Sequence, residues 1–287
     1  MWLLKVLSIG QIGWDVTTIN DKANKNFGGS VLHFCLAAAI MGMKTDMLCY
    51  ANKKEWESLI NELQQIGIGT DYIIDFEHTI HFNMYYDKEL RFCEERFSMD
   101  ISDTEPHIYE RIPYMAQYDL YNICETVPEQ DFKTLQIITD SNKDAVIAMQ
   151  FHIDNLLRDK KLYMSLLGKI DYLFMNYEEA LFLSGCNTLE SAIEFLKKRI
   201  KNIAFITSHN KNYAVSHKEV IIMEPMIVNT VVDPTGAGDC FAGGAIAGLC
   251  LNGQLETALR FGSMCSYFKL KGYSSNYLLE MLKVRRA

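Results

Sequence analysis

Short apolar runs alternate with longer segments of helical period along most of the chain. The short runs have the length and composition of buried strands, and the longer segments repeat apolar residues at the spacing of a helix. The predicted strands cover residues 5–10, 44–51, 71–76, 144–150, 172–176 and 202–207. The predicted helices cover residues 30–43, 55–68, 155–170, 189–200 and a glycine-rich segment that begins after Val232. This regular alternation predicts an α/β fold with a mostly parallel central sheet and helices on both faces.

Two segments depart from this rhythm. Residues 14–20 and 78–97 alternate polar and apolar side chains with no helix between them, which predicts antiparallel strands with one solvated face. We therefore expect one domain over residues 1–287, with a small β-strand lid formed by strands from about 14–27 and 76–100.

The predicted lid has an apolar face made of Ile80, Phe82, Met84 and Tyr86. This face suits either of two partners. It predicts a homodimer that pairs through the lid, or a cover for the substrate of its own chain, and the sequence leaves both open.

Composition excludes several classes of partner. The chain has 287 residues, of which 49% are hydrophobic, so it can bury a large core. A net charge of -8 argues against nucleic-acid binding and against a polybasic membrane contact. No uncharged apolar stretch reaches the roughly 20 residues of a membrane span. The eight cysteines contain no C-x-x-C pair, and the first ten residues resemble a strand more than a signal peptide, so we expect a cytoplasmic, reduced protein.

The segment VVDPTGAGDCFAGGAIAGL, residues 231–249, is the most informative stretch. An apolar strand is expected to stop at Pro234, which has no N–H group. The glycines that follow allow a tight turn and a close approach to a ligand, and the N–H groups at the start of the next helix would stabilise an anion. Asp239, in the first turn of that helix, is placed to accept a proton from an attacking hydroxyl group. The alternative is a glycine-rich turn in which Asp239 only caps the helix.

This segment resembles the C-terminal signature of the ribokinase-like (PfkB-type) sugar and nucleoside kinases. The resemblance implies a ribokinase-like fold and an ATP-dependent phosphotransferase, with Mg²⁺ as cofactor, that acts on a hydroxyl of a sugar, nucleoside or related polyol. It assigns the general base to Asp239 and the anion hole to Gly236, Ala237 and Gly238. Thr235, in the same segment, falls on the side of the nucleotide and magnesium. A monovalent cation is a possible further cofactor.

On the substrate side, residues 26–30 (NFGGS) resemble the N-terminal signature of the same kinases. The resemblance assigns substrate binding to Gly28, Gly29 and Asp15, whose carboxylate can accept hydrogen bonds from two hydroxyl groups. His33 stands where the family often has Asn. The alternatives are an ordinary helix start with Ser30 as N-cap, a solvated turn for Asp15, and a core histidine at position 33.

On the nucleotide side, the sequence from Asn176 to Glu179 resembles the N-x-x-E motif that organises magnesium, usually through water, so no direct protein-ligated metal is predicted. A plain helix start is the alternative there. Thr207 matches the first position of a T-x-G-x-x-G loop that wraps nucleotide phosphates, but His209 and Asn212 replace its glycines. The predicted strand 144–150 also lacks polar residues that similar kinases place near the substrate.

The substituted glycines motivate a second hypothesis, a catalytically weak or inactive ribokinase-fold protein that binds a small metabolite for regulation. A nicotinamide oxidoreductase is a third, more distant one, because the end of the first strand lacks the full dinucleotide fingerprint. The intact segment around Asp239 favours the kinase.

Overall fold

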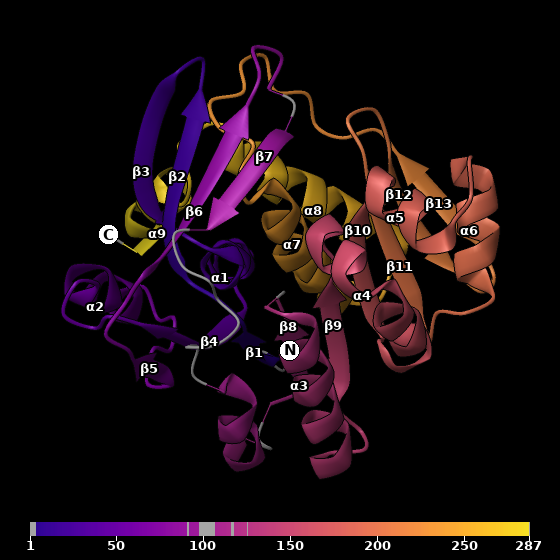
Figure 1. Ribbon diagram of the computed structural model, residues 1–287, viewed down its shortest axis with the longest axis horizontal. Helices are drawn as coiled ribbons and strands as arrows, with labels where there is room; N and C mark the ends of the chain where they lie inside the picture. Colours follow the sequence, from indigo (N-terminus) through magenta and orange to yellow (C-terminus); the bar gives the residue numbers. More distant parts are fainter. Residues whose placement is uncertain (1–3, 91, 98–106, 116–117, 125, 287) are drawn as a thin grey trace.

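A nine-stranded sheet forms the centre of the computed structural model, which describes residues 4–90, 92–97, 107–115, 118–124 and 126–286 (Figure 1). Its strands, in spatial order, are β13 (Val220–Met223), β12 (Asn212–Ser216), β11 (Ile203–Thr207), β10 (Tyr172–Asn176), β9 (Val146–Gln150), β8 (Leu120–Ile123), β1 (Lys5–Ile9), β4 (Lys44–Ala51) and β5 (Ile73–Asp75). Neighbours from β11 to β5 are parallel, and β12 and β13 add an antiparallel edge. The predicted mostly parallel sheet is confirmed.

Helices cover both faces of this sheet, as the alternation predicts (Figure 1). One face packs against α1 (Ser30–Ile40), α2 (Glu57–Gln65), α7 (Ala237–Asn252), α8 (Leu255–Lys269) and α9 (Asn276–Arg286). The other packs against η1 (Ile108–Met115), α3 (Pro128–Ser141), α4 (Ile153–Leu166), η2 (Leu167–Lys169), α5 (Tyr177–Ser184) and α6 (Leu189–Lys197).

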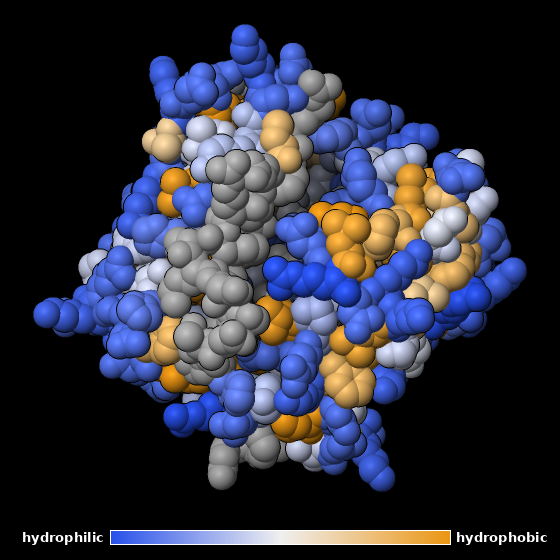
Figure 2. All heavy atoms as spheres, in the orientation of Figure 1, coloured by the Kyte–Doolittle hydropathy of each residue, from blue (hydrophilic) through white to orange (hydrophobic). Residues whose placement is uncertain are grey.

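The molecular face seen in Figure 2 is mostly hydrophilic, with small hydrophobic areas between the polar side chains. Large apolar side chains such as Trp56 and Phe205 lie in the core instead. Within the described residues, no helix combines the length and the apolar character needed to cross a membrane.

A second sheet of four strands lies beside one end of the central sheet (Figure 1). Its spatial order is β3 (Lys22–Gly28), β2 (Gly13–Ile19), β6 (Ile80–Tyr86) and β7 (Phe92–Phe97). The two hairpins are antiparallel, as predicted, but β2 and β6 pair in parallel, so a wholly antiparallel sheet is wrong. Alternation of polar and apolar residues has the same period in both pairings, so it cannot distinguish them. Positions 91 and 98–100 of the predicted lid lie outside the described residues.

The inner face of this sheet mixes polar and apolar side chains. β2 buries Asp15 and Thr17, whereas β6 buries Ile80, Phe82 and Met84. A buried carboxylate on a strand requires partners, and the neighbouring elements supply them.

The segment that precedes α7 differs from the prediction. Residues 224–236 form no strand, although their apolar residues suggest one. The N–H group of Met226 donates to Ser263 Oγ (2.7 Å), and that of Val232 donates to the Leu270 carbonyl (2.8 Å). Because these hydrogen bonds go to α8 and to the turn after it, the segment follows that helix and adds no strand to the sheet.

The glycine-rich helix α7 is packed tightly between two other helices. A Cβ atom on Gly243 would lie 2.5 Å from the Phe34 carbonyl oxygen of α1. One on Gly244 would collide with the Phe261 carbonyl oxygen of α8 and lie 2.8 Å from Cys265 Sγ. Gly243 and Gly244 therefore let α7 pack closely against both neighbouring helices.

We expect Gly244→Ala to lower the free energy of unfolding by about 1–3 kcal/mol, the usual cost of overpacking a core. Thermal unfolding followed by circular dichroism measures this loss. Gly238→Ala is the matched control, since the Cβ position there has no neighbour within 4 Å. Alanine also favours a helix more than glycine does, so the control should keep or slightly raise the melting temperature. Equal effects of the two substitutions would contradict the close contact between α7 and α8.

Candidate active site

A cavity of about 360 Å³ lies at the carboxyl ends of the parallel strands, between α7, α4 and the second sheet. In α/β sheets of this kind, ligands bind at that edge. The residues predicted for the site that line this cavity are Asp15, Gly29, His33, Asn176, Glu179, Thr207, Thr235, Gly236, Ala237, Gly238 and Asp239. Gly28 is the predicted residue that does not line it. Residues far apart in the sequence therefore meet around one space.

The turn before α7 presents the start of the helix to this cavity. Gly236 is the residue before the helix and has a φ of 78°, which favours glycine. The N–H group of Ala237 donates to the Pro234 carbonyl (3.2 Å). The N–H groups of Gly238 and Asp239 belong to the first turn, where the helix backbone offers them no acceptor, and the Asp239 N–H group approaches its own carboxylate. These two donors, together with the helix dipole, can stabilise an anion in the cavity.

Asp239 is half-buried at the edge of this anion site. Burial raises the pKa of its carboxyl group above the ordinary value, and the charge of Asp15 raises it further. His33 and His152 act in the opposite direction and lower this pKa. A carboxylate with a raised pKa is a stronger base, which suits proton abstraction from a hydroxyl group.

Asp15 is 2% exposed and lies in a network of donors. Its Oδ1 accepts a hydrogen bond from the Gly29 N–H group (3.1 Å), and its Oδ2 lies 2.8 Å from His33 Nε2 and 2.6 Å from Ser274 Oγ. A Cβ atom on Gly28 would overlap the Asp15 carboxylate, so that glycine makes room for the acid without lining the cavity. The alternative of a solvated turn for Asp15 is wrong.

The first helix begins without a side-chain cap. Gly29 occupies the N-cap position and Ser30 is the first helical residue, so the alternative with Ser30 as N-cap is also wrong. His33 is 1% exposed, yet its ring lines the cavity and packs against Gly236. Its ring therefore joins Asp15 to the turn that carries the anion site.

Asn176 and Glu179 form a capping box at the start of α5. Glu179 Oε2 accepts from the Asn176 N–H group (2.6 Å), and Asn176 Oδ1 accepts from the Glu179 N–H group (2.9 Å). Burial raises the pKa of Glu179 to about 7, against the lowering effects of His152 and of backbone N–H groups. A buried carboxylate that lines the cavity fits a hydrated Mg²⁺ nearby, whose charge would favour its ionised form. In the described part of the chain, no three His, Cys, Asp or Glu side chains form a metal cluster.

The turn after β11 does not need the glycines that the sequence lacks. Thr207 lines the cavity, whereas His209 is exposed and Asn212 is buried at the start of β12. Ser208 closes the turn through hydrogen bonds to the Lys211 backbone. None of residues 208–211 has a positive φ, so His209 causes no backbone strain.

Thr235 bonds to the second sheet. Its Oγ1 lies 3.3 Å from Thr17 Oγ1 of β2 and 3.1 Å from the Tyr86 hydroxyl of β6. Its N–H group donates to Asp233 Oδ1 (2.9 Å). These contacts join the turn before α7 to the predicted lid.

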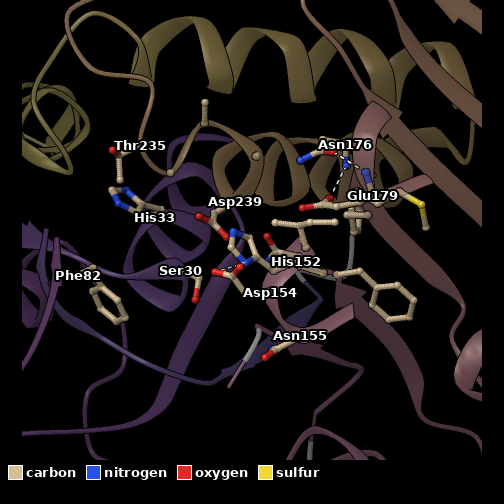
Figure 3. A pocket seen from close by; sticks show the side chains of 18 of the residues that line it. Ser30, His33, Phe82, His152, Asp154, Asn155, Asn176, Glu179, Thr235 and Asp239 are labelled. Atoms are coloured by element: carbon tan, nitrogen blue, oxygen red, sulfur yellow. Dashed lines mark hydrogen bonds and ion pairs between the residues drawn. The ribbon is translucent and has the colours of Figure 1, made fainter. Parts of the chain in front are cut away.

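Sequence reasoning missed the polar residues that follow β9. Gln150, at the end of that strand, and His152, Asp154, Asn155 and Arg158, at the start of α4, all line the cavity. Gln150 alone belongs to the predicted strand 144–150, and its place in the cavity lining departs from the expectation that this strand lacks polar residues near the substrate. His152 Nδ1 lies 3.8 Å from Asp154 Oδ2, and Figure 3 shows the His152 ring beside Asp239. The available signal was the run of polar residues directly after a buried parallel strand.

Comparison with known proteins assigns this arrangement to one family. The family model described as pfkB family carbohydrate kinase matches residues 7–280. The cytidine kinase of Thermococcus kodakarensis is 25% identical over 276 residues, which cover 91% of this chain and 94% of that protein.

Solved structures share the fold. The nucleoside kinase of Burkholderia thailandensis, in complex with inosine, superposes with a TM-score of 0.80 at 14% identity and covers 98% of this chain and 95% of that one. An E. coli protein described as a ribokinase II, in complex with ATP and Mg²⁺, gives a TM-score of 0.77 at 19% identity and covers 99% of this chain and 100% of that one. The predicted ribokinase-like fold is confirmed.

The pKa of Glu179 predicts a pH-dependent stability difference. In the folded protein the pKa of Glu179 is about 7, above the ordinary 4.5. The protonated Glu179 side chain therefore contributes its full share of the folding free energy below pH 4.5, and this share is lost as the pH rises through 7. Glu179→Gln keeps the capping box and removes the titration. In the presence of EDTA, we expect this variant to gain stability relative to wild type by on the order of 3 kcal/mol between pH 4.5 and 8.

Chemical denaturation at several pH values measures this difference. Glu178→Gln changes the exposed neighbour and should show a much smaller pH effect. A constant difference between Glu179→Gln and wild type across this range would contradict the raised pKa.

Proposed function

The chain belongs to the pfkB family of carbohydrate kinases, and we propose that it transfers the γ-phosphoryl group of ATP to a hydroxyl group of a nucleoside or sugar, with Asp239 as general base. One observation carries this proposal. Asp239 and the turn from Gly236 to Gly238 share a single cavity with Asp15 and with Asn176, Glu179 and Thr207.

In this proposal the acceptor hydroxyl lies between Asp239 and the transferring phosphoryl group. Asp239 accepts the proton of the hydroxyl as its oxygen attacks phosphorus. The N–H groups of Gly238 and Asp239 donate to the phosphoryl oxygens and stabilise their charge. The roles of Gly236 and Ala237 are then to shape the turn that points these donors into the cavity.

The nucleotide binds on the side of Thr207 and Glu179 in this proposal. Mg²⁺, when bound, neutralises charge on the phosphate oxygens. Glu179 would hold it through coordinated water, with the Asn176 capping box keeping the carboxylate in place. Thr235 supports the turn through its bonds to Thr17 and Tyr86.

We propose that the second sheet is the lid of this cavity. Phe82, Met84 and Tyr86 of β6 line the cavity of their own chain, which supports the substrate-cover alternative for this face. A homodimer through the lid stays an untested prediction, and three of the four residues on which it rested, Phe82, Met84 and Tyr86, line the cavity. A closed lid would exclude water and so limit the hydrolysis of ATP.

Nucleosides are the acceptor class that we propose first. The aromatic rings of Phe82 and Phe151 line the cavity, and aromatic rings stack readily on nucleobases. The cytidine kinase of Thermococcus kodakarensis agrees with this choice. Gln150, Asn155 and Arg158 add donors that suit the polar edge of a base or the hydroxyls of a ribose.

We expect one or more nucleosides or sugars to stimulate ADP release from Mg-ATP. Asp239→Asn should lower kcat by about 10²- to 10⁴-fold, the usual contribution of a general base, and should bind ATP with little change. A coupled assay measures ADP, and calorimetry measures ATP binding. A variant that retains most of the wild-type turnover would contradict the role of Asp239.

The pH dependence of kcat/KM provides a separate test. Asp239 acts as a base only when ionised, so activity falls as the pH decreases through its pKa. Because the pKa of Asp239 is raised from 3.8, we expect the acidic fall of kcat/KM to have its midpoint above pH 3.8. His152→Gln removes a charge that lowers the pKa of Asp239, so in this variant the acidic fall of kcat/KM should move to higher pH. An acidic limb at or below pH 3.8, with protein that remains folded, would contradict this assignment.

A further inference from the structure

Lys269, the last residue of α8, is fully buried (0% exposed) and lies directly behind the turn that carries the anion site. Its Nζ atom lies 3.0 Å from the Asp233 carbonyl oxygen, 3.3 Å from the Gly272 carbonyl oxygen and 3.7 Å from Asp233 Oδ2. A charged side chain leaves water at a high cost in free energy unless its surroundings compensate the charge. Here all three neighbours are oxygen atoms.

These three oxygens match the ammonium group. Charged lysine has three N–H donors and no acceptor. Here it donates to the two carbonyl oxygens, and the Asp233 carboxylate lies at ion-pair distance. Lys269 also stands at the carboxyl end of α8, where the helix dipole favours a positive charge.

The same surroundings decide whether a free monovalent cation fits here. Carbonyl and carboxylate oxygens are the groups that replace the hydration shell of a desolvated K⁺ in proteins. In this chain the ammonium group already occupies the space among them, and a second positive charge beside it would be repelled. The residues present therefore do not fit a monovalent cation at this position.

Asp233 connects Lys269 to the active site. The carboxylate of Asp233 accepts hydrogen bonds from the N–H groups of Thr235 (2.9 Å) and Ser274 (2.7 Å). Thr235 is the residue before Gly236, which shapes the anion site. Lys269 thus supports both the backbone carbonyl and the carboxylate of the residue that fixes this turn.

The backbone of Ser274, in the loop after α8, is held in an unusual conformation. Its φ is 42°, a left-handed conformation that is unfavourable for a serine and that surrounding contacts must maintain. In this conformation its N–H group bonds to Asp233 and its hydroxyl lies 2.6 Å from Asp15 Oδ2. The loop that Lys269 holds through Gly272 therefore reaches both buried carboxylates.

We propose that the Lys269 ammonium group is a built-in monovalent cation of this kinase, which supplies positive charge and fixes the turn behind the anion site, so that phosphoryl transfer needs no added K⁺ or Na⁺. Lys269 is a positioning residue in this proposal and touches no substrate. The proposal deepens the kinase function above and rests on it for its consequence in catalysis.

The first experiment uses the wild-type protein. ADP release is measured at constant ionic strength with K⁺, Na⁺ or tetramethylammonium as the only monovalent cation. Because the site is already filled, we expect the rates to agree within about twofold, since an ion with no site cannot shift the equilibrium. Clear stimulation by K⁺ or Na⁺ over tetramethylammonium would overturn the proposal.

The second experiment removes the ammonium group. Lys269→Ala should lower kcat/KM in tetramethylammonium by about 10- to 100-fold, the usual effect of losing a supporting partner of an active-site group. K⁺ or NH₄⁺ should restore part of this activity, because either ion can enter the space that the side chain leaves. Lys271→Ala is the matched control, since Lys271 is an exposed lysine two residues away and its loss should change neither the rate nor the ion response.

A third readout does not depend on catalysis. Binding of K⁺ to the folded Lys269→Ala protein should raise its melting temperature, by mass action, whereas wild type should show no such rise relative to tetramethylammonium. This measurement stands even if no acceptor is phosphorylated, so failure of the kinase function and failure of the cation proposal are distinguishable. Lys269→Ala protein that folds but gains neither activity nor stability from K⁺ or NH₄⁺ would make Lys269 a structural brace alone and overturn the proposal. If Lys269→Ala does not fold, the wild-type ion series decides.

Discussion

The arrangement of the proposed active site depends on the buried carboxylate of Asp233. A fully buried acid must be matched by hydrogen bonds and by a nearby positive charge, or the fold loses several kcal/mol. Asp233 obtains these from the Thr235 and Ser274 N–H groups and from Lys269, and Thr17 Oγ1 lies at 3.5 Å. Its partners come from the turn itself, from the loop after α8, from α8 and from β2. The position of the proposed anion site is therefore fixed by parts of the chain that are distant in sequence.

The same contacts couple the second sheet, the proposed lid, to the turn before α7. Thr17 and Tyr86 of the second sheet approach Thr235, and Ser274 joins Asp233 to Asp15 on β2. A movement of the lid would change the surroundings of both buried carboxylates. Substrate binding beneath the lid and the geometry of the anion site are thus expected to change together, which is a physical basis for delaying transfer until the lid is closed.

The sequence predicted those features that local chemistry determines. Alternation of apolar runs predicted the parallel sheet, and the glycines of residues 231–249 predicted a tight turn with Asp239 in the first helical turn. It failed where long-range pairing decides, as in the parallel contact of β2 with β6 and in the unpaired segment before Asp233. It also missed Lys269 and Ser274, because an ordinary lysine and serine near a helix end give no sign of burial or of a positive φ.

The departures from the family pattern also have a physical explanation in this fold. His33 takes a position where the family often has Asn, yet its ring bonds Asp15 and packs against Gly236, so it completes the support of the anion site. His209 stands in a turn whose residues need no positive φ, and its side chain is exposed. The missing glycines, which motivated the hypothesis of an inactive binding protein, therefore leave the backbone of this turn unstrained. Because the groups proposed for proton abstraction and anion stabilisation also share one cavity, the geometry favours transfer over binding alone.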